Sequence, residues 1–246
     1  MTAALRITGL KKAFGGLPAT NDVSLQVMPG ERRLIIGPNG AGKTTLFNLF
    51  TGDLKPDQGT IELFGENVTR MRPDQRAQRG VARTYQIITL FGKETLEHNI
   101  VLSLLGLSAV RWGGFRPLSA YPELYEEARR ALGQVGLEHL AHRPVAEVSY
   151  GEKRRVEIAM ALAQKPRLLL LDEPLAGLSR EERAAVKDLI ATIPREVTVL
   201  MIEHDMDTAL DMAERITLLH YGTVIVEGSR AEVVADPKTR EVYLGN

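Results

Sequence analysis

The sequence predicts an α/β protein with a mostly parallel sheet. Antiparallel strands are expected in the N-terminal part of the chain, and a block of helices is inserted further along it. Alternating apolar and polar residues at 5–10 and 59–65 indicate antiparallel strands. Residues 95–163 show helical periodicity and no strand pattern, so they predict the inserted block. Short, almost entirely apolar runs indicate parallel strands buried on both faces, at 34–36, 168–171 and 197–202.

The N-terminal part alternates strands, turns and short helices. A Pro-Gly pair marks the turn before the apolar run 34–36. This run leads into "GPNGAGKTT", and a helix follows because apolar residues recur at helical spacing as far as Gly52. Pro73 to Arg79 predict a short helix, with proline near its start and Gly80 past its end.

The C-terminal part returns to strand, helix and strand. Apolar residues at helical spacing predict a helix through Met206 to Ala213, and "ITLLHYGTVIVEG" predicts a hairpin that turns at Tyr221 and Gly222. Within the inserted block, one apolar helix face is formed by Leu124, Ala128, Ala131, Leu132 and Val135.

Composition limits the functions that the chain can have. Its 246 residues include 31 basic and 31 acidic side chains, so the net charge gives no indication of a nucleic-acid partner. The absence of cysteine excludes disulfides, thiolate metal sites and cysteine nucleophiles. The longest uncharged apolar stretch, Ile100 to Val110, is far shorter than the ~20 residues of a membrane-spanning helix. With no signal-peptide pattern at its start, we expect a soluble cytoplasmic protein.

The segment "GPNGAGKTT" matches the phosphate-binding loop pattern G-x-x-x-x-G-K-T, with a strand before it and a helix after it. Its glycines allow backbone N–H groups to approach a polyphosphate without Cβ clashes. Lys43 is expected to reach the β- and γ-phosphates of a nucleoside triphosphate, and the Thr44 hydroxyl to ligate Mg²⁺. The predicted nucleotide-binding residues here are Gly37, Pro38, Asn39, Gly40, Ala41, Gly42, Lys43, Thr44 and Thr45.

A second element, "RLLLLDEP", supplies two carboxylates. Its four leucines predict a buried strand that ends at Asp172, at the sheet edge where open α/β folds bind ligands. We expect Asp172 to serve the metal, and Glu173 to orient and deprotonate an attacking water. Taken alone, Asp-Glu-Pro is equally consistent with a polar strand terminus. Its combination with the glycine loop favours the catalytic interpretation.

A third segment, "VSYGEKRRVEIAMALAQKP", begins a helix with a capping box, because Ser149 precedes Glu152 by three residues. Such a helix N-terminus offers a serine hydroxyl and the Gly151 amide to an anion. The pattern alone, however, favours an ordinary capped surface helix.

Over nearly its whole length, the chain resembles the ATP-binding-cassette (ABC) ATPases. The third segment lies directly before the acidic strand, where that family has its signature motif Leu-Ser-Gly-Gly-Gln. This sequence departs from the motif at Val148, Tyr150 and Glu152 but keeps Ser149 and Gly151. The resemblance implies that Ser149 and Gly151 bind the nucleotide.

The resemblance also assigns roles outside these segments. Phe14 matches the aromatic residue that stacks on adenine, and Gln86 matches the glutamine that ligates Mg²⁺. The sequence "AGLS" at 176–179 matches the D-loop, and His204 matches the histidine that contacts the γ-phosphate. Alone, His204 would fit an ordinary surface histidine at a strand end. The implied catalytic residues are Lys43, Gln86, Glu173 and His204, and the implied metal residues are Thr44, Gln86 and Asp172.

Among ABC proteins, "RGVARTYQIITLF", "SYGEKRRVEIAMAL", "EPLAGLS" and "EVYLGN" are similar to the ATPase subunits of bacterial branched-chain amino-acid importers. This similarity implies one ABC ATP-binding domain, 1–246, with a nucleotide-binding core at 1–94 and 164–246 and a helical subdomain at 95–163. The implied reaction is hydrolysis of ATP, with Mg²⁺, to ADP and phosphate. The implied location is the cytoplasmic face of the inner membrane, as a peripheral protein.

The same similarity implies partners. These are transmembrane permease subunits, contacted near Gln86, Leu90 and Phe91, and a second ATPase subunit, identical or paralogous, in a head-to-tail dimer. A periplasmic solute-binding protein would act indirectly, and no nucleic acid is expected.

Three alternatives stay open. The cassette could serve another ABC system, such as urea-type import or lipopolysaccharide export. It could be a non-transport ABC protein that acts on ribosomes or DNA, but those carry two cassettes or a long coiled coil, and this chain has neither. It could also be a metabolic kinase with a phosphate-binding loop, which would need neither Ser149 to Gly151 nor His204.

Overall fold

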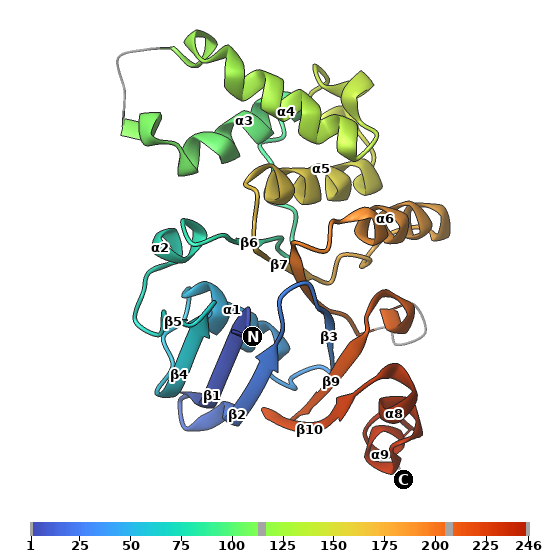
Figure 1. Ribbon diagram of the computed structural model, residues 1–246. Coiled ribbons are helices and arrows are strands. Elements are labelled where there is room, and N and C mark those ends of the chain that lie inside the picture. Colours follow the sequence, from blue (N-terminus) through green and yellow to red (C-terminus); the bar gives the residue numbers. More distant parts are fainter. Residues whose placement is uncertain (1, 113–116, 205–208, 245–246) are drawn as a thin grey trace. The chain divides into compact units, whose positions relative to one another are not determined.

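The computed structural model describes residues 2–112, 117–204 and 209–244 (Figure 1). It confirms an α/β fold with a mostly parallel sheet, an antiparallel sheet and a group of helices. The residues pack into two compact units. Unit 1 consists of Met1–Arg83, Arg167–Pro174 and Ile193–Asn246, and unit 2 of Thr84–Pro166 and Leu175–Thr192. The subdomain boundaries that the sequence suggests stay a prediction.

The first sheet of unit 1 is antiparallel and has the strand order β2-β1-β4-β5. Along its strands, buried and exposed residues alternate over much of their length, which is the pattern of a sheet with one face on a core. The two alternating segments of the sequence thus form strands, as predicted. The bounds are β1 Leu5–Phe14, β2 Leu17–Val27, β4 Gln58–Leu63 and β5 Glu66–Asn67.

The second sheet of unit 1 has the order β10-β9-β3-β8-β7-β6. All neighbours are parallel except β10, which pairs with β9 as the predicted hairpin. Every residue of β3, β7 and β8 is buried, which explains the apolar runs 34–36, 168–171 and 199–202 within them; β3 begins with two arginines that are buried as well. The bounds are β3 Arg32–Ile36, β6 Val81–Arg83, β7 Leu168–Asp172, β8 Thr198–Ile202, β9 Arg215–His220 and β10 Thr223–Gly228.

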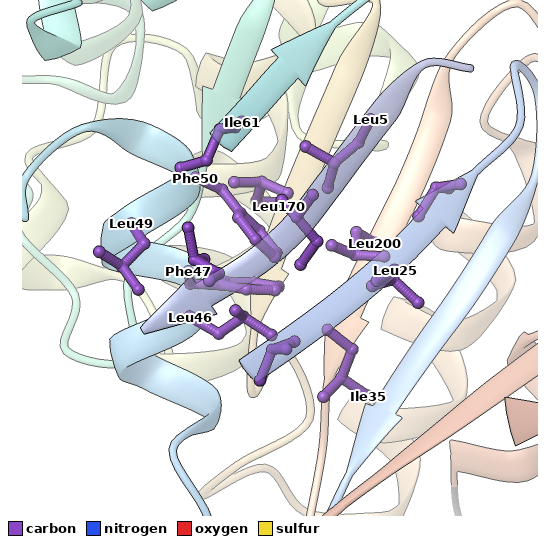
Figure 2. Close-up of a cluster of buried hydrophobic side chains, with 14 of the residues drawn as sticks. Leu5, Leu25, Ile35, Leu46, Phe47, Leu49, Phe50, Ile61, Leu170 and Leu200 are labelled. Carbon is purple, nitrogen blue, oxygen red and sulfur yellow. The ribbon is translucent and has the colours of Figure 1, made fainter. Parts of the chain in front are cut away.

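Helix α1 (Lys43–Thr51) joins the two sheets through one apolar cluster. Figure 2 shows its side chains Leu46, Phe47 and Phe50 among those of strands from both sheets, including Leu25 and Leu170. The phosphate-binding loop, Gly37 to Thr45, begins directly after β3 and enters α1, so its position is fixed by this core on both sides.

The C-terminal end of α1 is held by a buried arginine of α2 (Pro73–Ala77). The Arg76 guanidinium is 1% exposed and donates to the main-chain oxygens of Leu49 and Phe50, at 2.6 and 2.8 Å. It also donates to those of Thr69 and Met71, both at 3.2 Å. Because the last carbonyls of a helix lack partners within it, Arg76 supplies donors that α1 itself does not have.

Two further helices that the structure describes in unit 1 are α8 (Arg230–Ala235) and α9 (Pro237–Leu244). Ser229 caps α8 through a capping box with Glu232. Of the helix expected from Met206 to Ala213, the structure describes residues 209–213, in which Ala209 is α-helical and the 3₁₀ turn Leu210–Met212 follows. Met206 lies outside the described residues.

Unit 2 contains the helices α3 (Leu96–Leu107), α4 (Pro122–Gln134), α5 (Tyr150–Ala163) and α6 (Arg180–Thr192), besides short 3₁₀ turns. The predicted apolar face of α4 is buried at Ala128, Ala131 and Leu132. Among the helices that the structure describes, none has the length and apolar character needed to cross a bilayer.

Candidate functional site

The phosphate-binding loop needs glycine at two positions because its backbone runs against neighbouring strands. A Cβ on Gly37 would lie 2.2 Å from the carbonyl oxygen of Leu219, and one on Gly42 would lie 2.2 Å from that of Ala19. Gly42 also has a φ of +100°, which L side chains rarely adopt. The sequence of the loop is therefore dictated by close packing as well as by ligand access.

Lys43 is buried at the start of α1, and its ammonium donates to the main-chain oxygens of Gly37 and Pro38, at 2.7 and 3.1 Å. Burial lowers the pKa of Lys43, while the nearby carboxylates of Glu173 and Asp172 oppose that shift. The predicted lysine and the two predicted carboxylates are thus brought into electrostatic reach of one another.

The N-terminus of α1 is open to an anion. Its N-cap is Gly42, which makes no side-chain cap, and Thr44 and Thr45 follow in the first turn. Uncapped amide groups and the helix dipole both favour negative charge at this point. The arrangement is suited to the phosphate groups of a nucleotide.

Asp172 ends β7 and is 1% exposed. Arg83, from β6, donates to its Oδ2 at 2.7 Å and to the Asn48 side chain of α1 at 2.6 Å. Arg83, which sequence reasoning missed, therefore orients the Asp172 carboxylate, the group predicted to bind the metal. The Thr44 hydroxyl and the Asp172 carboxylate are oxygen donors of the kind that Mg²⁺ prefers beside phosphate and water, so the residues present fit that ion.

Glu173 follows directly, with a φ of +47° that is unusual for a residue with a side chain. Its amide donates to the carbonyl of Ile202 on β8, which holds the strand end in place. The His204 Nδ1 lies 3.5 Å from the Glu173 Oε2, and the imidazole is half-exposed. Strained backbone that is held by its surroundings is common where side chains are aimed at a reaction.

Phe14, the predicted adenine-stacking residue, ends β1 in the same unit. Its ring is 49% exposed, and the Lys12 ammonium lies 5.7 Å from the ring centroid. A half-exposed ring beside a cation is available for stacking on a planar base.

In unit 2, the predicted capping box is confirmed. The Glu152 amide donates to the Ser149 hydroxyl at 3.1 Å, and the Ser149 amide donates to the Glu152 carboxylate at 2.7 Å. Glu152, which departs from the family motif, thus satisfies an amide at the start of α5.

Glu182, in the first turn of α6, also reaches the start of α5. It accepts hydrogen bonds from the amides of Gly151 and Ser179, both at 3.0 Å. The Ser179 amide first, and the Gly151 amide second, lower the pKa of the Glu182 carboxyl. Sequence reasoning missed this contact, because Gly151 and Glu182 are 31 residues apart in the chain.

Gln86 lies in unit 2, and its carbonyl accepts a hydrogen bond of 3.1 Å from Arg154 of α5. Arg154 is completely buried and pairs with Glu157 at 2.9 Å. Sequence reasoning missed this pair as well. Its spacing of three residues on one helix was the available indication, but such pairs usually lie on solvated faces.

The segment that follows Gln86 exposes large apolar side chains. Ile87 is 78% exposed and Phe91 is 62% exposed, and Tyr85, which precedes Gln86, is 45% exposed. Exposed apolar side chains that gather in one segment are typical of a protein-contact surface.

The predicted site residues therefore divide between the two units. Unit 1 brings together Lys43, Asp172, Glu173 and His204 at the carboxyl ends of its parallel strands. Unit 2 holds Gln86, Ser149 and Gly151.

Known proteins show the same organisation in sequence. The family model described as ABC transporter matches residues 20–176. The high-affinity branched-chain amino acid transport ATP-binding protein LivG of Escherichia coli (strain K12) is 36% identical over 250 residues, which cover 98% of this chain and 97% of LivG. The lipopolysaccharide export system ATP-binding protein LptB of Acidithiobacillus ferridurans is 36% identical, covering 100% of this chain and 98% of LptB.

Solved structures agree. MJ1267, an ATP-binding cassette of an ABC transporter, superposes with a TM-score of 0.88 at 31% identity and covers 99% of each chain. A dimeric post-hydrolysis state of the ATP-binding cassette MJ0796, bound to ADP and Pi, gives a TM-score of 0.79 at 25% identity, covering 92% of this chain and 98% of that one.

Proposed function

The chain belongs to the ABC transporter family as an ATP-binding, ATP-hydrolysing subunit, and from this premise we propose that it powers the import of branched-chain amino acids. The proposal that the solute is a branched-chain amino acid rests on the full-length similarity to LivG. The site geometry supports the ATPase chemistry independently of that similarity.

Binding of ATP begins at the phosphate-binding loop. The amides at the start of α1 and the Lys43 ammonium donate hydrogen bonds to the phosphate oxygens, and Phe14 stacks on the adenine. In doing so, Lys43 exchanges its bonds to the Gly37 and Pro38 carbonyls for phosphate oxygens. These carbonyls hold the ammonium in place beforehand, so little reorganisation is needed.

Hydrolysis uses the residues at the ends of β7 and β8. Glu173 accepts the proton of the attacking water, and His204, held beside it, stabilises charge that develops on the γ-phosphate. Thr44 and Asp172 would hold Mg²⁺, which would supply positive charge to offset the negative charge of the phosphates. Gln86 is proposed as a further ligand on the strength of the family resemblance.

A second copy, or a paralogous subunit, completes the site with its Ser149 and Gly151. The dimeric structure of the ATP-binding cassette MJ0796, bound to ADP and Pi, supports a dimer of such subunits, and the head-to-tail arrangement is proposed on the strength of the family resemblance. In this structure the Gly151 amide donates to the Glu182 carboxylate, so this hydrogen bond has to break before the amide can donate to a γ-phosphate.

The permease subunits dock on the segment after Gln86, at the cytoplasmic face of the inner membrane, with a periplasmic solute-binding protein acting from the other side. The exposed side chains of Ile87 and Phe91 support this docking surface. Replacing both by serine should abolish membrane association with co-expressed permease subunits. Val234→Ser, which alters an exposed apolar side chain on α8, should not.

The deciding experiment measures ATP hydrolysis by the chain assembled in lipid discs with the permease subunits encoded beside its gene. Leucine-loaded binding protein should stimulate hydrolysis several-fold, and urea should not. Stimulation by urea alone, or none by any amino acid, would overturn the proposed solute.

Lipopolysaccharide export is the second candidate, because LptB has the same 36% identity to this chain as LivG. If the function is lipopolysaccharide export, the chain should co-purify with permease subunits that bind lipopolysaccharide. Its rate of ATP hydrolysis should then not change when amino acids are added. The same discs, prepared with and without lipopolysaccharide, separate the two functions.

A further inference from the structure

The main chain around Gln86 is tied to α5 by a buried arginine. The Arg154 Nη1 donates to the carbonyl of Tyr85 at 2.8 Å, and its Nη2 donates to the carbonyl of Gln86 at 3.1 Å. Arg154 has no exposed surface. A guanidinium is planar and rigid, so two bonds from one fork fix the direction of the peptide units that they hold.

Glu157, one turn further along α5, extends this connection. Its Oε2 accepts from the Arg154 Nη1 at 2.9 Å, and its Oε1 accepts from the Thr89 amide at 3.4 Å. The carboxylate is 7% exposed. The segment from Tyr85 to Thr89 is therefore attached to α5 at both of its ends.

Stability alone does not explain this pair. Burying two charges costs desolvation energy that their attraction often fails to repay, and two apolar side chains of similar volume would pack as well. What apolar side chains cannot do is bind the carbonyls and the amide of a segment that lies outside helices and strands. The observed partners therefore indicate that the pair holds the segment in position.

We propose that Arg154 and Glu157 are positioning residues, which lock the main chain at Gln86 to α5 so that Gln86 and the Ser149 end of the same helix move as one piece. This inference rests on the proposed function for the roles of Gln86 and Ser149. It adds a mechanical link, within unit 2, between the residue proposed to ligate Mg²⁺ in one chain's site and the residues proposed to complete the partner's site.

The test variant is Arg154→Met/Glu157→Gln, which removes both charges without leaving either one buried alone. Arg155→Met is the matched control, because Arg155 also lies on α5 and donates to a carbonyl, that of Val135, at 3.0 Å. Arg154→Lys keeps the charge beside Glu157, yet a single ammonium is a poor substitute for the fork, so it serves if the double variant does not fold.

Hydrogen exchange without nucleotide is the first measurement. Peptides covering residues 85–90 should exchange roughly tenfold faster in the double variant, because the segment opens more often once its carbonyls lose the Arg154 guanidinium. Their exchange rates should be unchanged in Arg155→Met. The second measurement is the gain in ATP affinity on adding Mg²⁺, by calorimetry. The double variant should lose about as much of that gain as Gln86→Ala, and combining the two changes should lose no more. Binding of ATP in EDTA should be the same in all variants.

Two failures are distinguishable. Wild-type exchange rates at 85–90 in both Arg154 variants would overturn the inference, whatever Gln86 does. If Gln86→Ala itself leaves the Mg²⁺ effect intact, the proposed metal role of Gln86 is wrong, and the exchange rates still decide whether Arg154 and Glu157 hold the segment.

Discussion

Replacing Glu157 by glutamine should change how the stability of the protein depends on pH. Burial raises the pKa of the Glu157 carboxyl from 4.5 to about 7, although the Arg154 guanidinium opposes the shift. The folded state therefore holds the Glu157 proton more tightly than the unfolded state does. Its contribution to stability is fully present below pH 4.5 and is lost as the pH rises through 7. The interval of about 2.5 pH units corresponds to about 3 kcal/mol.

Glutamine resembles the protonated carboxyl in size and hydrogen bonding, and it does not ionise. The variant and the wild type should thus have similar unfolding free energies at pH 4.5. At pH 8, the variant should be the more stable of the two by up to about 3 kcal/mol. Urea unfolding followed by circular dichroism, at half-unit steps between pH 4.5 and 8, measures the difference. Comparison with the wild type cancels the other titrating groups.

Glu182→Gln is the control of opposite sign. Hydrogen bonds from the Ser179 and Gly151 amides lower the pKa of Glu182, so its contribution is present above its unfolded pKa and is lost as the pH falls. Relative to the wild type, Glu182→Gln should become less stable as the pH rises. A difference between Glu157→Gln and the wild type that does not vary with pH would refute the reasoning about burial.

Four more outcomes are expected. Glu173→Gln should lower the rate of ATP hydrolysis by roughly 10²–10⁴-fold and form a dimer with ATP and Mg²⁺ in size-exclusion chromatography, and adding Ser149→Arg should abolish that dimer. A folded Lys43→Ala should bind no ATP in calorimetry, and full activity would contradict the assignment of the phosphate-binding loop. Gly42→Ala should destabilise the fold by roughly 1–3 kcal/mol in urea unfolding, because its Cβ would meet a main-chain oxygen, whereas Gly40→Ala has open space and should cost less. Arg76→Met should lower the unfolding free energy by about 3 kcal/mol, because it leaves buried carbonyls unpaired; a loss under 1 kcal/mol would show that water replaces the guanidinium.

The sequence predicted those parts of the site that depend on local order along the chain. A loop between a strand and a helix has to carry its glycines and Lys43 in register, and a buried strand has to end at its carboxylate. Both constraints can be recognised from a few consecutive residues of the sequence. The capping box at Ser149 was predictable for the same reason, since its two members are three residues apart.

The contacts that it did not predict join residues far apart in the chain. Arg83 orients Asp172 because β6 and β7 are neighbours, and nothing near Arg83 in the sequence indicates that pairing. Arg154 looks like one of several surface charges until the segment at Gln86 is placed against α5. Such side chains are recognised only when their burial and their partners are known.

The strand order of the parallel sheet has a consequence for synthesis of the protein. Strand β3 leads into the phosphate-binding loop, yet both of its neighbours, β8 and β9, come from residues after Val197. A nascent chain on the ribosome thus carries β3 for most of translation before either of its sheet neighbours emerges. Pairing over such sequence distances is slow, so chaperones have a long interval in which to bind this strand, and polypeptides released before β9 is made are candidates for proteolysis rather than folding.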